Sequence, residues 1–106
     1  MKSKKFVKIP EETKEGLKML ATLKSLTLSD ITALLISEYM RDHPTPGEDC
    51  TKHVEEATDE DRLDGITFYL DQEIEMDMKM YVLKNKVTQA ILIHCAFVNS
   101  PYRELL

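Results

Sequence analysis

The stretch KFVKIPEETKEGLKMLATLKSLTLSDITALLISEYM, residues 5–40, changes its hydrophobic period at Pro10. Before the proline, alternation predicts a short strand of about five residues, because successive side chains of a strand point to opposite faces. This alternation places Val7 and Ile9 on one face and three residues on the other: Lys4, Phe6 and Lys8. Pro10 cannot donate to a strand ladder, but it suits the first turn of a helix, where the glutamates that follow complement the helix dipole. The sequence therefore predicts a strand that leads directly into a helix.

Two amphipathic helices are predicted after the strand. Apolar residues recur at helical spacing from Glu11 to about Lys24, and again after the hydroxyl-rich turn SLTLSD. Thr27 or Ser29 is the expected N-cap of the second helix, and His43-Pro44 ends it. A single unit this small cannot bury a core, so the pattern predicts that two such units interlock.

The second half of the chain repeats the pattern. GITFYL alternates like the first strand, Asp71 can cap a helix, and TQAILIHCAFV predicts a final helix that is apolar nearly all round. A shift of 61 residues overlays the two halves: Ile9 on Leu70, Leu17 on Met78, Leu20 on Tyr81, Leu26 on Val87, Thr27 on Thr88, and Ile31 on Leu92. We therefore divide the chain into a first unit, residues 1–43, an acidic connector, 44–62, and a second, divergent unit, 63–106.

Length and composition are those of an ordinary globular chain. The 106 residues are 42% hydrophobic and 31% charged, enough for one compact domain or two small units that share a core. No apolar run approaches the roughly 20 residues of a membrane span, and no signal peptide is apparent, so we expect a cytoplasmic protein. Two cysteines are too few for a disulfide framework.

Charge is distributed unevenly. The net charge is -5, but residues 1–44 carry +2 and residues 45–106 carry -7. The overall value argues against nucleic acid as a partner, because phosphate binding depends on cationic side chains. A small basic surface on an otherwise acidic protein can still bind DNA, and the first strand offers such a surface.

The pattern in residues 4–43 resembles the ribbon-helix-helix family of Arc/MetJ-like DNA-binding proteins, and residues 65–98 resemble it more loosely. The resemblance implies a mainly α fold with one short two-stranded antiparallel ribbon, formed by two βαα units in one core. The tandem arrangement is similar to that of TraY-type conjugation regulators. Two assemblies remain open: a ribbon formed within one chain, which we favour, or a homodimer whose ribbon forms between chains.

The resemblance also implies a site on double-stranded DNA. The ribbon would enter the major groove and contact base edges through five residues: Lys4, Phe6, Lys8, Thr67 and Tyr69. The starts of the second helices and a neighbouring lysine would contact phosphates: Lys5, Thr27, Leu28, Ser29, Thr88 and Gln89. Two features depart from the family, since Phe6 stands where a polar residue is more frequent and the second strand carries no cation. The acids Asp71, Glu73, Glu75 and Asp77 would also repel phosphate near that strand.

Other chemistry finds little support in the sequence. No nucleophile–base pair, glycine-rich phosphate loop or carboxylate dyad stands out, so we expect neither an enzyme nor a cofactor. Cys50, His53, His94 and Cys95 are four possible zinc ligands, but the last two are adjacent on a helix and point about 100° apart, so no metal site is expected. The favoured function is a transcriptional repressor. The alternatives are a plasmid conjugation or partition accessory protein, and an antitoxin-like module that binds a basic partner through the acidic connector and the second half.

Overall fold

Two strand–helix–helix units build the protein, as the repeat predicts. The computed structural model describes residues 2–45 and 63–105, so most of the predicted connector lies outside the described residues. In this part of the chain each strand is followed by two α-helices, and a short 3₁₀ helix comes last. The elements are β1 (Lys2–Pro10), α1 (Glu11–Leu23), α2 (Leu28–Asp42), β2 (Leu63–Asp71), α4 (Gln72–Asn85), α5 (Gln89–Val98) and η1 (Pro101–Leu105).

The two strands pair antiparallel within the one chain and form a two-stranded ribbon. Each strand has nine residues rather than the expected five. Phe6 faces Thr67 at the centre of the register, and the 61-residue repeat relates these same two residues. A pseudo-twofold axis therefore passes through the middle of the ribbon and exchanges the Lys4–Tyr69 end with the Lys8–Gly65 end.

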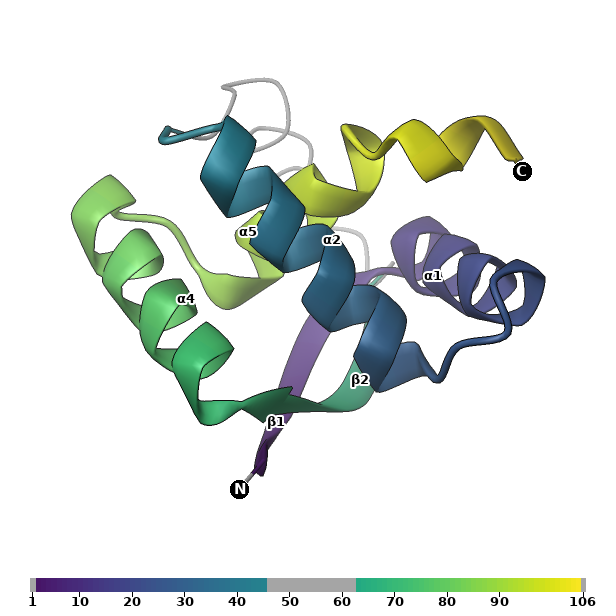
Figure 1. Cartoon of the computed structure of the whole chain (residues 1–106), viewed down its shortest axis with the longest axis horizontal. Coiled ribbons are helices and arrows are strands. Elements are labelled where there is room, and N and C mark those ends of the chain that lie inside the picture. Colours follow the sequence, from purple (N-terminus) through teal and green to yellow (C-terminus); the bar gives the residue numbers. More distant parts are fainter. Residues whose placement is uncertain (1, 46–62, 106) are drawn as a thin grey trace.

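The ribbon and the helices enclose one core. The inner face of the ribbon contributes Ile9, Ile66, Phe68 and Leu70, while α5 is buried along seven consecutive residues, Ile91 to Phe97. α2 packs on β2 and α5 packs on β1, so each unit covers the strand of the other. Figure 1 shows α1 and α4 on opposite flanks of the central helices α2 and α5. Because each unit covers the strand of the other, the two units are interlocked.

The turns between the paired helices are equivalent. Ser25 and Lys86, related by the repeat, both have left-handed backbones, with φ of 55° and 54°. The next amide in each turn bonds back into the preceding helix, Leu26 N to Ala21 O at 2.9 Å and Val87 N to Val82 O at 3.1 Å. This is the Schellman geometry that ends a helix and directs the chain into the next one.

Threonine caps start both second helices. Thr27 Oγ1 accepts from Asp30 N at 3.0 Å, and Thr88 Oγ1 accepts from Ile91 N at 3.2 Å. Asp71 occupies the N-cap position of α4 but makes no side-chain capping bond. The helix therefore begins at the predicted residue, but the expected capping by the Asp71 side chain is wrong.

Polar contacts also tie each first helix to the strand of the other unit. Lys14 of α1 binds Asp64 of β2 at 2.9 Å. The repeat makes Glu75 of α4 the equivalent of Lys14 in the second unit, and Glu75 contacts β1 through Lys5, whose Nζ lies 3.3 Å from Glu75 Oε2. The ribbon is thus held from both flanks.

In the described part of the chain, no single helix is long and apolar enough to cross a membrane. Among the helices described, α1 and α2 meet that length and composition only when taken together, and they are bent by 105° relative to each other.

Candidate nucleic-acid interface

The ribbon has a core face and an exposed face. The exposed face of β1 carries Lys2, Lys4, Phe6 and Lys8, and that of β2 carries Thr67, Tyr69 and Asp71. All five residues predicted to contact bases lie together on this surface, in the pairs Lys4–Tyr69 and Phe6–Thr67 with Lys8 opposite Gly65. Phe6 is 63% exposed and Tyr69 is 45% exposed, so neither aromatic ring covers the core edge.

Phe6 leans across the ribbon onto Gly65. A methyl group at Gly65 would lie 2.5 Å from Cζ and 2.6 Å from Cε2 of the Phe6 ring. The ring therefore occupies the space that any other side chain at position 65 would need, in the manner of an aromatic residue that shields a strand glycine. Since Gly65 faces Lys8 in the register, the ring is displaced from the pseudo-twofold axis toward the Lys8 end.

Lys5 has a different environment from the other strand lysines. The structure places it on the inner face, with its Nζ 3.3 Å from Oε2 of Glu75, and both side chains are largely buried. Lys79 also reaches Glu75, at 3.0 Å. Lys5 is thus separated from the exposed surface that carries Lys4 and Lys8.

Glu75 stays ionised, and its negative charge is balanced by Lys5 and Lys79. A hydrogen bond from Ser3, followed by bonds from Lys79 and Lys5, lowers the pKa of Glu75 from 4.5 to about 2. Burial acts in the opposite direction and is outweighed. Of the four acids expected to repel phosphate near β2, this one is therefore paired with cations inside the protein.

The helices α2 and α5 each pack against the strand of the other unit. Leu28 and Ser29 begin α2, and Gln89 begins α5, each after its threonine cap. The first amides of a helix have no intrahelical acceptor, so these turns can donate to an anion. Ser29 has a further contact, because its Oγ accepts from the backbone N–H of Tyr69 at 2.9 Å.

A hydroxyl–imidazole pair in the core was missed by the sequence reasoning. Thr13 Oγ1 and His94 Nδ1 are 2.6 Å apart and hydrogen bonded, although 81 residues separate them. The two residues are only 1% and 5% exposed, so a substrate cannot reach them. The repeat places Ile74 and Ala33 at the equivalent positions, and this mismatch between the halves is the one sequence signal that could have drawn attention to the pair.

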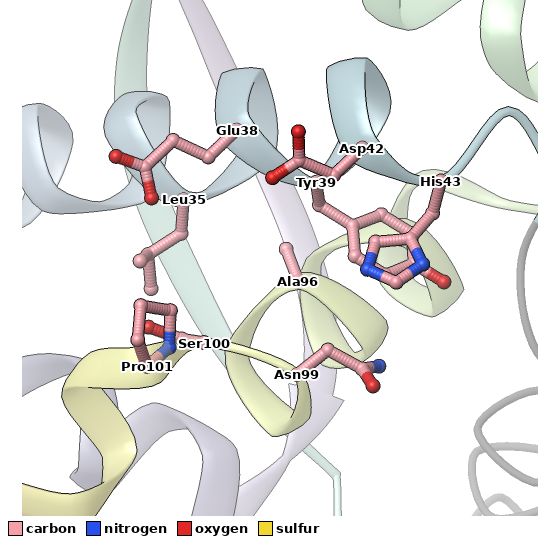
Figure 2. Close-up of a pocket in the computed structure, with 9 residues that line it drawn as sticks. All are labelled: Leu35, Glu38, Tyr39, Asp42, His43, Ala96, Asn99, Ser100 and Pro101. Atoms are coloured by element: carbon pink, nitrogen blue, oxygen red, sulfur yellow. The ribbon is translucent and has the colours of Figure 1, made fainter.

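The pocket in Figure 2 does not offer a ligand site. Its volume is about 40 Å³, far below the roughly 300–1,000 Å³ of a typical small-molecule site. Tyr39 and His43 stack at one end of it, with ring centroids 4.5 Å apart. The lining residues come from α2 and the residue after it, from α5 and the two residues after it, and from the first residue of η1: Leu35, Glu38, Tyr39, Asp42, His43, Ala96, Asn99, Ser100 and Pro101.

The described residues contain no group of three or more histidine, cysteine or acidic side chains that could hold a metal ion. Cys95 is fully buried, while Cys50 and His53 lie outside the described residues.

Comparisons with protein families, with curated proteins and with solved structures find no match to this chain.

Proposed function

We propose that the protein is a tandem ribbon-helix-helix protein that binds double-stranded DNA. One observation carries the proposal: a two-stranded ribbon, closed over a core on one face, presents lysines and exposed aromatic rings on the other. A two-stranded ribbon fits the major groove of duplex DNA. An exposed Phe6 and Tyr69 on a solvent-facing ribbon also favour a surface that is covered when a ligand binds.

The predicted contacts divide by chemistry. Lys4 and Lys8 can donate to guanine O6 and N7, Thr67 and Tyr69 can hydrogen bond base edges, and Phe6 can pack on a thymine methyl. The helix starts at Thr27, Leu28 and Ser29, and at Thr88 and Gln89, would bind flanking phosphates through backbone amides. Because Lys5 is engaged with Glu75, we assign it to holding the ribbon in place rather than to phosphate.

The proposed recognition is asymmetric. One end of the ribbon combines Lys4 with Tyr69, whereas the other combines Lys8 with Gly65 and the Phe6 ring that leans over it. A symmetric palindrome would present the same bases to these two different ends. We therefore expect a bound site whose two halves differ in sequence.

The biological role follows from the resemblance alone. We favour transcriptional repression at a defined operator, with an accessory role in plasmid conjugation or partition as the alternative.

A double substitution tests the proposal. Lys4→Ala with Lys8→Ala should weaken binding to a duplex selected from a random pool by at least about tenfold, and should reduce the salt dependence of the binding constant by about one to two in the log–log slope. Lys18→Ala with Lys84→Ala removes the same charge from exposed positions on α1 and α4, so it is the matched control. If the wild-type protein enriches no duplex, the proposal fails. Equal losses in the two double variants would mean that the ribbon face is not the binding surface.

Protein binding through the second unit is a second candidate. Three apolar residues of α4 are strongly exposed on one side of the helix: Met76, Met80 and Leu83. An exposed apolar stripe favours a protein partner. A Met80→Glu and Leu83→Glu variant should then lose a co-purifying partner while DNA binding stays unchanged. Retention of the same partner by the variant would exclude this surface.

A further inference from the structure

The hydrogen bond between Ser29 and Tyr69 links the start of α2 to the edge of the ribbon. Ser29 Oγ accepts from Tyr69 N at 2.9 Å, across 40 residues of sequence. In a two-stranded ribbon, the N–H groups that do not face the partner strand point out along the two edges. The Tyr69 N–H is one of these edge donors, and a side chain of the other unit satisfies it.

The position of this bond matters because Tyr69 is the exposed residue beside Lys4 on the predicted DNA-facing surface. A bond to the backbone N–H restrains the φ angle of Tyr69 and with it the direction of the Cα–Cβ bond. The tyrosine ring has few rotatable bonds of its own, so its location in a groove depends mainly on its backbone. Ser29 thus influences where the ring stands without touching it.

The other end of the ribbon cannot be held in the same way. The 61-residue repeat places Ala90 at the position of Ser29 and Lys8 at the position of Tyr69. An alanine side chain has no atom that accepts a hydrogen bond. α5 still packs beside β1, but its residue 90 cannot hold the Lys8 N–H.

We propose that Ser29 is a positioning residue that holds Tyr69 against α2 and makes the Lys4–Tyr69 end the more rigid, more selective end of the ribbon. This inference rests on the proposed DNA-binding function. The Lys8 end, with a flexible side chain and no equivalent hydroxyl, accommodates more base sequences. Selectivity is therefore divided unequally between the two halves of the bound site.

Amide exchange measured by NMR tests the structural half of this inference without DNA. Ser29→Ala should speed exchange at Tyr69 N–H by about five- to tenfold, the factor that one ordinary hydrogen bond represents. Ser29→Thr keeps the hydroxyl and should restore slow exchange. Ala90→Ser should slow exchange at Lys8 N–H by a similar factor, because it supplies the missing acceptor. Unchanged exchange at Tyr69 in Ser29→Ala overturns the inference.

Selection from a random duplex pool tests the recognition half. Tyr69→Ala identifies the base pairs that depend on Tyr69. Ser29→Ala should reduce base preference by about fivefold at those same positions, leave the other half of the site unchanged, and be rescued by Ser29→Thr. An equal loss in both halves, or an unchanged profile, overturns the inference alone. Failure of the wild-type protein to enrich any duplex overturns the proposed function instead.

Discussion

Gly16 lies in the interior of α1, directly against the ring of Phe97 from α5. A methyl group built on Gly16 would be 2.1 Å from Cζ and 2.6 Å from Cε1 of that ring, whereas ordinary contact begins at 3.4 Å. The ring would have to retreat by more than 1 Å, yet it is only 7% exposed and has core on its other sides. Overpacking of this kind costs about 1–3 kcal/mol, and so severe an overlap belongs at the upper end.

Helix propensity acts in the opposite direction. Alanine is favoured over glycine in a helix interior by about 1 kcal/mol. We therefore expect Gly16→Ala to lower the free energy of unfolding by about 2 kcal/mol. For a chain of this size, this loss lowers Tm by roughly 8 °C or more. Urea denaturation followed by circular dichroism measures both the midpoint and the slope, so a change in stability can be separated from a change in the unfolded state.

A Phe97→Leu background supplies the control. Leucine lacks the ring atoms that overlap the new methyl group, so Gly16→Ala in that background should become neutral or stabilising by up to about 1 kcal/mol. If Gly16→Ala alone is as stable as the wild type, or if it costs the same in both backgrounds, then the packing of α1 on α5 has been misjudged.

Three further substitutions test other parts of the structure. Gly65→Ala should leave the urea midpoint almost unchanged, because the exposed Phe6 ring can swing away from the new methyl group. The displaced ring should weaken affinity for duplex DNA by about tenfold in a binding titration. Unchanged affinity would show that Phe6 does not contact the DNA. Glu75 has a folded pKa of about 2, below its ordinary 4.5, so its contribution to stability is complete above pH 4.5 and is lost as the pH falls toward 2. Glu75→Gln should therefore lower the free energy of unfolding at neutral pH and make it depend less on pH between 4.5 and 2, as measured by urea titrations. An equally steep fall with pH in the variant would contradict the role given to Glu75. Ser25→Gly should raise the free energy of unfolding by about 1 kcal/mol, because φ is 55° at this residue; a loss of stability would show that Ser25 is not strained.

Local sequence determined the elements of this protein and their order. The change of period at Pro10, the turn residues before Thr27 and the alternation in both strands depend on neighbours a few residues apart. A periodicity of 2 or 3.6 residues is set by backbone geometry, so it can be recognised without knowing the fold. The same alternation predicted correctly that Lys4, Phe6 and Tyr69 share one exposed face once the strands pair.

The repeat extended this reasoning to the tertiary level. Two units that each lack a complete core must pair, and their similarity predicts a pseudo-twofold arrangement. The matching left-handed turns at Ser25 and Lys86 and the matching caps at Thr27 and Thr88 confirm that the two halves are built alike.

Only the tertiary structure decided which side chains meet across the two units. The Ser29–Tyr69 bond joins residues 40 positions apart, and the inward Lys5 finds its partner, Glu75, on a helix of the other unit. The lean of the Phe6 ring onto Gly65 likewise follows from the pairing of distant strands. Such contacts depend on register and packing, which are collective properties of the folded core, whereas residue type and spacing describe only the chain near each residue.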